Sequence, residues 1–376
     1  MSGVVIVGAG QAGFQTAASL RLEGFSGPIT LIGDEPHLPY QRPPLSKGVL
    51  AGTQAVDSLL FRPERFYQDH SIELMLSQRA VSIDREARRV GLASRMSVEY
   101  DHLVLATGAR VRKLPVPGVL YLRDRDDALE LRARLEPAGT VAIVGGGFIG
   151  LEVAAVARAM GKPVTLVEAQ DRLMARCVAP VVSECFRELH ASQGVTVILN
   201  STEIPRADLI VAGIGVIANV ELAHVAGLTV RNGIVVDAFL KTADSNIFAI
   251  GDCAEAANGM RLESVQNAAD QARSVATQII RGPSAYRAVP WFWTDQFDVK
   301  LQMAGISSPR HKVVLRGAVE SRKFSVFYFD GADRLAAVDS VNRPGDHIVA
   351  RKMLAARTAL IAEQAADESV DLKGLL

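Results

Sequence analysis

The sequence predicts an α/β protein with two Rossmann-like dinucleotide-binding domains and a C-terminal α+β domain that contains an antiparallel sheet. Three observations lead to this prediction. The glycine motif G-x-G-x-x-G occurs twice, each time after a short apolar strand pattern and before a helix pattern. After residue 290 the chain changes to a series of alternating strand patterns, which are typical of an antiparallel sheet.

The second glycine motif shows the pattern most fully. Val141–Val144 is a short β-branched run, as expected of a parallel strand that is buried on both faces. Gly145 permits the tight turn after this strand, Gly147 lets a pyrophosphate approach the backbone, and Gly150 lets helix and strand pack closely. The motif therefore predicts a site for the pyrophosphate of a dinucleotide.

An acidic residue completes this second unit. The helix pattern after the glycines stops at Gly161, and a second strand pattern, Val164–Val167, leads directly to Glu168. A carboxylate at this distance from the glycines accepts hydrogen bonds from a ribose 2′-hydroxyl. It would repel a 2′-phosphate, so Glu168 predicts NADH rather than NADPH as the ligand.

The first glycine motif repeats this order near the start of the chain. Strand patterns at Val4–Val7 and Ile29–Ile32 lie on either side of a helix that closes near Gly24. The motif glycines are Gly8, Gly10 and Gly13. The acids Asp34 and Glu35 follow the second strand, and either could hold a ribose, with Glu35 favoured. Two such units in one chain imply two dinucleotides, and hence electron transfer.

A proline-rich segment follows the first unit. Residues 37–47 read H-L-P-Y-Q-R-P-P-L-S-K, and prolines preset an extended, stiff backbone. We expect this segment to carry Arg42 and Lys47 to fixed positions at the exit of the sheet. On spacing alone, a rigid surface loop with solvated cations is an equal alternative.

Two later strands end in polar residues beside glycine. Leu103–Arg110 contains Thr107 and Gly108 at the carboxyl edge of a parallel sheet, where ligands of such sheets bind. Asn246–Ile250 ends at Asp252, which could reach a ribityl or ribose hydroxyl or could instead cap a helix. The helix expected behind this strand is Val265–Ile280.

The remaining elements are predicted from periodicity. Residues 114–118, L-P-V-P-G, indicate a hinge between domains. Further along lie a helix around Val181–His190 and strands at Val195–Leu199, Asp208–Ala212, Val299–Met303, Val313–Leu315, Phe324–Tyr328 and Leu335–Val341, with helical cover at Ala350–Ala365.

Composition narrows the function classes. The 376 residues include 41 Lys and Arg and 41 Asp and Glu, so no net charge argues for nucleic acid or an anionic membrane. The three cysteines form no C-x-x-C, no metal spacing and no even disulfide set, which suits a reducing cytosol. The seven histidines show no ligand spacing, so no metal site is expected. No pattern fits a signal peptide or a membrane span.

Taken together, the motifs resemble those of flavoprotein ferredoxin reductases that serve bacterial haem monooxygenases and Rieske dioxygenases, the putidaredoxin reductase type with a glutathione reductase-type fold. The resemblance covers nearly the whole chain. It rests on G-A-G-Q-A-G, P-Y-Q-R-P-P-L-S-K, A-T-G-A-R, G-G-G-F-I-G-L-E, G-I-G-V-I-A-N, G-D-C-A, R-L-E-S-V-Q-N-A and P-W-F-W-T-D-Q, in that order.

The resemblance implies the domains and the cofactor sites. Residues 1–113 and 229–289 would form a discontinuous FAD-binding domain, 114–228 an NAD-binding domain, and 290–376 a C-terminal interface domain. FAD would bind at Gly8, Gly10, Gly13, Asp34, Glu35, Arg42, Lys47, Ala106, Thr107, Gly108, Asp252, Val265 and Trp293. NADH would bind at Gly145, Gly147, Phe148, Ile149, Gly150, Glu168, Arg176, Gly213, Ile214 and Gly215.

The resemblance also implies a mechanism. Hydride would pass from NADH to the N5 position of the flavin, and electrons would then pass singly to a [2Fe-2S] ferredoxin docked near Trp293. Lys47, Glu152 and Trp293 are the implied catalytic residues. Lys47 would pair with Glu152 and stabilise negative charge on the flavin. For Trp291 and Phe292, core packing is the favoured interpretation.

The chain departs from the family pattern in three places. The connection after Leu199 is too short for the usual β-hairpin, and the segment between Cys253 and Arg261 is abbreviated. Ala218 stands where the family often has proline. These differences bear on partner docking and on closure over NADH rather than on a proposed cofactor contact.

Several other functions remain open. A flavin disulfide reductase or NADH peroxidase needs a reactive cysteine after the first unit, and residues 36–60 contain none. A rubredoxin reductase differs only in its partner, and a sensor resembling apoptosis-inducing factor would use NADH to change assembly. A basic docking face could be formed by Arg310, Lys312, Arg316, Arg322 and Lys323, which could equally be a solvated sheet face.

Overall fold

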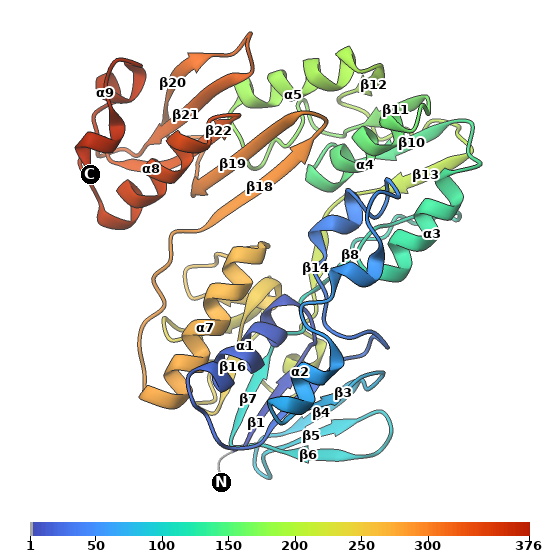
Figure 1. Ribbon diagram of the computed structural model, residues 1–376, viewed down its shortest axis with the longest axis vertical. Coiled ribbons are helices and arrows are strands. Elements are labelled where there is room, and N and C mark those ends of the chain that lie inside the picture. The colour runs from blue at the N-terminus through green and yellow to red at the C-terminus, as the bar shows by residue number, and fades with distance from the viewer. Residues whose placement is uncertain (1–2) are drawn as a thin grey trace. The chain divides into compact units, whose positions relative to one another are not determined.

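The computed structural model describes residues 3–376 (Figure 1). The chain forms two compact units, each made of three segments. Unit 1 contains the chain up to Gln41, Asp57–Arg110 and Val216–Ala288; unit 2 contains Arg42–Val56, Val111–Gly215 and Val289–Leu376. The division into three domains that the sequence suggested stays a prediction.

Unit 1 is built on a five-stranded parallel sheet. The strands, in spatial order, are β16 (Ile247–Ala249), β7 (His102–Leu105), β1 (Val4–Val7), β2 (Ile29–Ile32) and β3 (Ile72–Met75). Every residue of β1 and β2 is buried, as the continuous apolar runs predicted.

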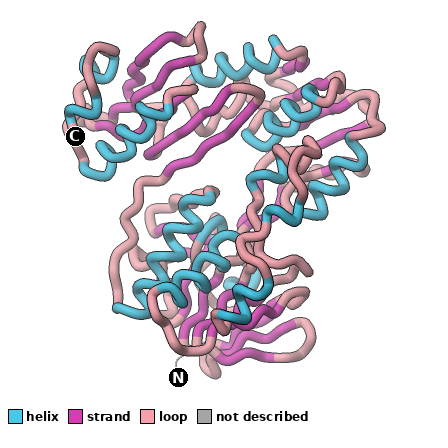
Figure 2. Tube along the Cα trace, in the orientation of Figure 1, coloured by secondary structure: helices cyan, strands magenta, loops and turns pink. Residues whose placement is uncertain are grey.

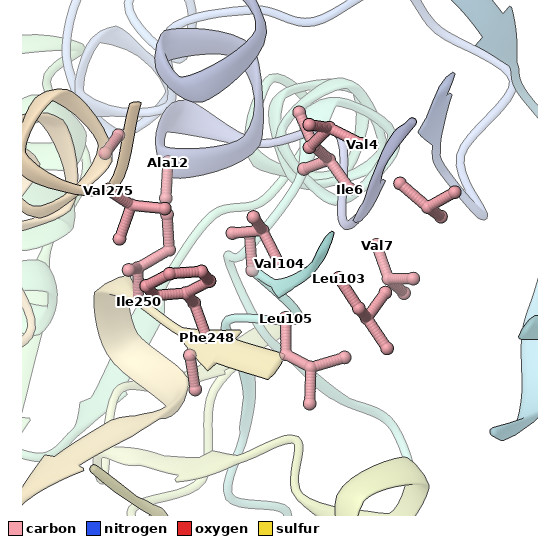
Figure 3. Packing of buried hydrophobic residues seen from close by; sticks show 14 of the residues in the cluster. Val4, Ile6, Val7, Ala12, Leu103, Val104, Leu105, Phe248, Ile250 and Val275 are labelled. Atoms are coloured by element: carbon pink, nitrogen blue, oxygen red, sulfur yellow. The ribbon is translucent and has the colours of Figure 1, made fainter. Parts of the chain in front are cut away.

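Helices α1 (Gln11–Leu22) and α7 (Val265–Arg281) pack against each other beside this sheet. Figure 3 shows Ala12 of α1 and Val275 of α7 meeting side chains of the central strands in one apolar cluster. The smaller elements of unit 1 are α2 (Glu64–Asp69), β4 (Ala80–Asp84), β5 (Arg89–Leu92), β6 (Ser97–Glu99), β14 (Val216–Ala218), α6 (Glu221–Val225), β15 (Ile234–Val236) and β17 (Ala254–Ala256).

Unit 2 repeats the parallel sheet. Its strands, in spatial order, are β12 (Val195–Ile198), β11 (Val164–Val167), β10 (Val141–Val144), β13 (Leu209–Ala212) and β9 (Val119–Leu120). The helices of this part are α3 (Arg125–Leu135), α4 (Phe148–Ala159) and α5 (Pro180–Ser192). In both sheets the strand before the glycine motif is central and the next two strands follow on one side, so the predicted repeat is confirmed.

The end of the chain forms an antiparallel sheet, as predicted. Its strands, in spatial order, are β18 (Trp291–Gln296), β19 (Val299–Gly305), β22 (Leu335–Val341), β21 (Lys323–Phe329) and β20 (Lys312–Ala318). Figure 2 shows these strands side by side, with the C-terminal helices next to them. Side chains of α8 (Pro344–Ala356) and α9 (Ala362–Ala366) share an apolar cluster with β19, β21 and β22.

Two sequence-based expectations were wrong. Residues 37–47 are not extended throughout, because Pro43–Ser46 form a 3-10 turn (η1) with the prolines at its start, where their fixed φ suits a helical turn. The helix expected at Ala350–Ala365 is two helices, since Arg357 adopts a left-handed conformation (φ 55°) that ends α8.

Two buried ionisable side chains lie in the C-terminal sheet region. Both ring nitrogens of His347 on α8 lack a hydrogen-bond partner among the described residues, and burial lowers the pKa of His347 to about 4. Burial raises the pKa of Asp339 on β22 to about 7, although Tyr328 donates a hydrogen bond to it. Tyr328 in turn accepts a hydrogen bond from the backbone N–H of Ala179, 2.8 Å away, where α5 begins.

These two groups should give opposite pH dependences of stability. Between about pH 6.5 and 4 the unfolded chain protonates His347 and the folded chain does not, so stability falls as pH falls. Between about pH 4 and 7 the unfolded chain ionises Asp339 and the folded chain keeps its proton, so stability falls as pH rises.

We therefore expect His347→Phe to gain melting temperature relative to the wild type as pH is lowered from 7 to 4. Asp339→Asn should gain relative melting temperature as pH is raised over the same range. Calorimetric scans of both variants at several pH values test this. Parallel curves for variant and wild type would contradict the assigned pKa directions.

Candidate functional site

The first glycine turn, in unit 1, contains two glycines that the protein itself requires. A Cβ on Gly8, whose φ is +113°, would lie 2.1 Å from the carbonyl oxygen of Ala106. A Cβ on Gly13 would lie 1.8 Å from the carbonyl oxygen of Gly8. No side chain fits at either position without moving the backbone.

The middle glycine of the turn has a different environment. Gly10 has an extended backbone and is the N-cap of α1, and a Cβ added there would meet no atom within 4 Å. No side chain caps the first turn of α1, so its backbone N–H groups face this open space. A free helix N-terminus beside a glycine with open space fits a dinucleotide pyrophosphate.

The second glycine turn, in unit 2, repeats this arrangement. A Cβ on Gly145 would lie 2.6 Å from the carbonyl oxygen of Gly213, and one on Gly150 would lie 2.1 Å from that of Gly145. Gly147, the N-cap of α4, has only one neighbour, an oxygen 3.8 Å from its added Cβ. Each unit therefore has, at a helix N-terminus, a glycine beside open space, as the close approach of a pyrophosphate requires.

Glu168 lies beside the second turn with both carboxylate oxygens engaged. Oε2 accepts a hydrogen bond from the N–H of Gly146 at 2.6 Å, and Oε1 accepts one from the N–H of Gln170 at 2.8 Å. Each oxygen keeps a further lone pair for a ribose hydroxyl. A Cβ on Gly146 would lie 3.2 Å from Oε2, so glycine at this position leaves room for the acid.

The equivalent position in unit 1 is occupied differently. Gly33 follows β2 directly, as Glu168 follows β11, and a Cβ on Gly33 would clash with Ala9 at 2.7 Å. The acids come one and two residues later. Asp34 is exposed, whereas Glu35 is half-buried and accepts a 2.6 Å hydrogen bond from Tyr40. This geometry favours Glu35 as the ribose ligand, which stays a prediction.

The Thr107–Gly108 turn is held by a residue that the sequence reasoning did not single out. The Thr107 hydroxyl donates to the carbonyl of Asn219 at 2.6 Å, and the Asn219 side-chain amide donates to the carbonyl of Thr107 at 2.9 Å. The N–H of Asn219 also bonds to Gly108, and Arg110 donates to its side-chain oxygen. Asn219 ends the motif G-I-G-V-I-A-N, which was the available signal.

Asp252 lies in a short 3-10 turn after β16 and is half-buried. Its carbonyl accepts a hydrogen bond from Arg261 at 3.0 Å. The helix that follows is capped by Ser264, whose hydroxyl accepts from the N–H of Asn267, so Asp252 is not the cap of α7. Val265, the first residue of α7, is also half-buried.

The ion pair that the resemblance implied is present in unit 2. Lys47 Nζ lies 2.7 Å from Glu152 Oε1, and the Glu152 side chain is 4% exposed. The same carboxylate accepts hydrogen bonds from Ser46 and from Thr294, the latter at 2.6 Å. Glu152 therefore has three donors from two distant segments, which is how a buried charge is stabilised.

The aromatic residues of β18 divide between its two faces. Phe292 packs on Phe148 of α4, with ring centroids 4.7 Å apart. Trp291 packs on the C-terminal core and carries Arg351 over its ring at 4.6 Å, which agrees with core packing. The ring centroids of Trp293 and Trp291 are 5.6 Å apart. The approach of Trp293 to the flavin stays a prediction.

The other predicted nucleotide residues lie around the second turn or on its helix. Ile149 is 43% exposed on α4. The backbone of Gly213–Gly215 follows β13, and a Cβ on Gly215 would be 3.7 Å from Arg176. Arg42 precedes η1, and its guanidinium donates to the carbonyl of Arg123 at 2.9 Å.

The predicted site residues separate between the two units. Unit 1 contains the first glycines, the acids after β2, the Thr107–Gly108 turn, Asp252 and Val265. Unit 2 contains all predicted NADH residues and Glu152, together with Arg42, Lys47 and Trp293, which the resemblance assigned to FAD. The cofactor roles of these residues remain predictions.

One candidate docking residue was wrongly placed on a surface. Arg316 is 5% exposed, and its guanidinium donates to the backbone carbonyls of Asp367 and Val370. It therefore fixes the C-terminal residues to β20. Arg310, Lys312 and Lys323 are exposed, whereas Arg322 is only partly so.

Within residues 3–376, no group of His, Cys, Asp and Glu side chains is arranged to hold a metal ion. In the same part of the chain, no helix combines the length and the apolar character that crossing a membrane requires.

The glycine geometry gives a matched pair of variants. Gly13→Ala should destabilise the protein by about 1 to 3 kcal/mol or more, because its Cβ forces the backbone apart. Gly10→Ala should keep the melting temperature of the apoprotein, because the added Cβ meets no protein atom within 4 Å. It should weaken FAD binding by about tenfold or more, because the Cβ occupies space that the pyrophosphate needs. Calorimetry and flavin titration measure the two effects. Equal stability loss in both variants would contradict this distinction.

The three cysteines should differ sharply in reactivity. Cys177 is exposed, whereas Cys185 and Cys253 are buried, and burial raises the pKa of both buried thiols. We expect a thiol reagent at pH 8 to label Cys177 within minutes and the other two only on unfolding. Mass spectrometry of labelled peptides tests this, and rapid labelling of Cys253 in the folded protein would reopen a thiol-based function.

Comparison with known proteins agrees with this geometry. A family model described as pyridine nucleotide-disulphide oxidoreductase matches residues 2–272, and one described as reductase C-terminal matches residues 291–376. The chain is 49% identical to rhodocoxin reductase of Rhodococcus erythropolis over 98% of this chain and 93% of that protein. That alignment spans 399 residues, more than this chain has, so the relative has insertions.

Two solved structures superpose on nearly the whole chain. The ferredoxin reductase of the CYP199A2 system from Rhodopseudomonas palustris gives a TM-score of 0.95 at 47% identity, covering 100% of this chain and 99% of that one. Putidaredoxin reductase in its covalent complex with putidaredoxin gives 0.95 at 38% identity, covering 100% and 98%. The fold class, the resemblance and the expectation of FAD and NADH are thereby confirmed, and the chain belongs to the pyridine nucleotide-disulphide oxidoreductase family, among its flavoprotein ferredoxin reductases.

Proposed function

We propose that this protein takes electrons from NADH onto FAD and delivers them singly to a [2Fe-2S] ferredoxin that feeds a haem monooxygenase or a Rieske dioxygenase. The observation that carries this proposal is the pair of glycine turns, each with one glycine that only a ligand requires. Two nucleotide sites in one chain suit the transfer of electrons between two nucleotide cofactors.

The cofactors, when bound, supply the hydride transfer and the stepwise electron delivery. The chain supplies binding and orientation. The first turn and Glu35 would hold FAD, and the second turn and Glu168 would hold NADH. The Thr107–Gly108 turn, fixed by Asn219, would place its hydroxyl and amides at the carboxyl edge of the unit 1 sheet.

Lys47 is the residue we assign to electrostatic stabilisation. Its ammonium is held by a buried carboxylate and is still 27% exposed, so it can meet a ligand. A fixed positive charge needs no reorganisation when negative charge develops beside it, which is the basis of its effect. No proton donor or acceptor of the His type is needed for this step.

The structure disfavours the thiol-based alternatives. Disulfide reductases and peroxidases on this fold need a reactive cysteine in the first part of the chain, and residues 36–60 contain none. Cys253 is 0% exposed, with its sulfur near the carbonyls of Leu105 and Ile250. It is a small buried residue with a raised pKa, which makes it a poor nucleophile.

The partner is inferred from the relatives. Putidaredoxin reductase is 38% identical to this chain and has been crystallised as a complex with putidaredoxin. A rubredoxin–NAD(+) reductase of Pseudomonas putida is also 38% identical, over 91% of this chain, and is the second candidate. We place the protein in the cytoplasm, because none of its three cysteines forms a disulfide and NADH is available there.

The first experiment mixes the flavin-loaded protein anaerobically with NADH or NADPH and follows the visible flavin band by stopped flow. Fast bleaching by NADH and slow bleaching by NADPH is the expected result. Adding an oxidised [2Fe-2S] ferredoxin or a rubredoxin then separates the partners. Rapid multiple turnover supports a reductase, whereas a long-lived reduced complex would indicate a sensor. A protein that takes up no flavin would end the proposal.

Glu168 should set the choice of pyridine nucleotide. Glu168→Gln keeps an acceptor for the Gly146 N–H and removes the charge that repels a 2′-phosphate, so we expect the NADH to NADPH preference in kcat/KM to fall by about tenfold. Gln170→Ala is the control, because the contact of Gln170 with Glu168 uses only its backbone N–H. An unchanged preference in Glu168→Gln would remove Glu168 from this role.

A further inference from the structure

A chain of buried polar side chains leads to the Lys47–Glu152 pair along one face of β18. His190 on α5 lies 2.9 Å from Gln296, Gln296 lies 3.2 Å from Thr294, and Thr294 lies 2.6 Å from Glu152. All four of these residues belong to unit 2, and all four are buried.

The hydrogen bonds of this chain all point the same way. Thr294 Oγ1 donates to Glu152 Oε1, so its oxygen is free to accept from Gln296 Nε2. Gln296 then presents Oε1 to His190 Nε2, which must be the donor. His190 Nδ1 has no hydrogen-bond partner among the described residues, as expected of a neutral ring protonated on Nε2. Burial, which lowers the pKa of His190, favours this neutral form.

Burying polar side chains costs free energy unless they are hydrogen-bonded. Three polar side chains occupy buried positions between α4, α5 and β18, where apolar side chains of similar size could pack. Each side chain donates to the next, and the last donor, Thr294, meets the Glu152 carboxylate. Bonds in series to a charge strengthen one another in a low-dielectric interior.

We propose that His190, Gln296 and Thr294 form a positioning relay that fixes the Glu152 carboxylate and, through it, the Lys47 ammonium. The relay rests on the proposed function for its purpose, since Lys47 is the charge that serves the flavin. Thr294 touches Glu152, and Gln296 and His190 act only through Thr294. None of the three is a catalytic residue.

The Glu152 carboxylate forms its ion pair with Lys47 and accepts hydrogen bonds from Ser46 and Thr294. Lys47 and Ser46 approach from the segment at η1, while β10 and β11 contribute no charged side chain. Asp295 of β18 lies on the other face and pairs with Lys300 at 3.4 Å. His190 is the only other titratable residue in the chain of contacts just described.

The central test compares Thr294→Val with Thr294→Ser. Valine has nearly the shape of threonine and no donor, so in Thr294→Val the Glu152 carboxylate loses one of its three donors. In stopped-flow mixing of the flavin-loaded protein with NADH, we expect the rate of flavin reduction to fall by about tenfold in Thr294→Val, because the Lys47 ammonium is no longer held in one position. Thr294→Ser, which restores the donor, should keep the wild-type rate.

A second comparison tests whether the residues act in series. Gln296→Leu should slow flavin reduction by a smaller factor. The double variant Thr294→Val with Gln296→Leu should be no slower than Thr294→Val alone, because Gln296 has no route to Glu152 without the hydroxyl. Losses of rate that multiply in the double variant would overturn the serial arrangement.

Two measurements read the relay without turnover. Nitrogen NMR of the imidazoles should show His190 as the Nε2–H tautomer at pH 7 and should show it changed in Gln296→Leu. Carbon-13 methylation of the lysines, with Lys47→Arg for assignment, should give a Lys47 signal whose chemical shift is altered in Thr294→Val and restored in Thr294→Ser.

The outcomes separate the relay from the proposed function. Altered NMR signals in Thr294→Val, in a protein that NADH does not reduce, would keep the relay and end the proposed function. Normal reduction by NADH with reduction rates and NMR signals identical in wild type, Thr294→Val and Thr294→Ser would keep the function and overturn the relay. A Thr294→Val protein that is only less stable, with an unchanged reduction rate, would also overturn it.

Discussion

The buried carboxylate of Glu152 is the constraint on which the arrangement of unit 2 depends. It lies on α4, where the residues around it are apolar and Arg158 in the last turn is the other charged residue, and an uncompensated buried charge there would cost several kcal/mol. Its donors come from the 3-10 turn at Pro43–Ser46, from Lys47 beside it, and from Thr294 on β18. One charge therefore ties together a proline-rich segment, the helix of a nucleotide turn and the first strand of the C-terminal sheet. Those three segments are separated by more than a hundred residues of sequence on either side of α4.

The glycine turns show how sterics and ligand chemistry can be told apart at the same motif. The outer glycines are fixed by the approach of the chain to itself, since a Cβ would meet a carbonyl oxygen at 1.8 to 2.6 Å. The middle glycines meet no such contact, so the fold alone does not need them. A ligand bound at the helix N-terminus would explain these glycines, because the first N–H groups of each helix lack a side-chain cap. The same division in both units is stronger support for two nucleotide sites than either motif alone.

The two units share one sheet topology but differ in the residue that follows the second strand of the motif. In unit 2 the strand leads straight to Glu168, and Gly146 leaves room for its carboxylate. In unit 1 that position is Gly33, which must be small because Ala9 faces it, and the acid is displaced to Glu35. In unit 2 the glycine of this contact is Gly146 and the larger residue is Glu168, whereas in unit 1 the glycine is Gly33 and the larger residue is Ala9. This difference explains why the two acids predicted to bind ribose lie at different distances from their strands.

The sequence by itself determined the elements that depend on local pattern. Short apolar runs, motif glycines and following acids predicted strands β1, β2, β10 and β11 to the residue, because a strand buried on both faces and a turn that admits only glycine leave few alternatives. Strands β3 and β9 and helix α3 were not predicted. Alternation of apolar and polar residues likewise predicted the C-terminal sheet. Its first strand, β18, was not predicted, and the last helix was predicted to continue past Arg357, where α8 in fact ends. Only the tertiary structure placed Asn219 on Thr107, buried Arg316, and aligned His190, Gln296 and Thr294 behind Glu152. These contacts join residues up to 142 positions apart. No periodicity records such pairings, because they depend on which side chains meet after the elements have packed.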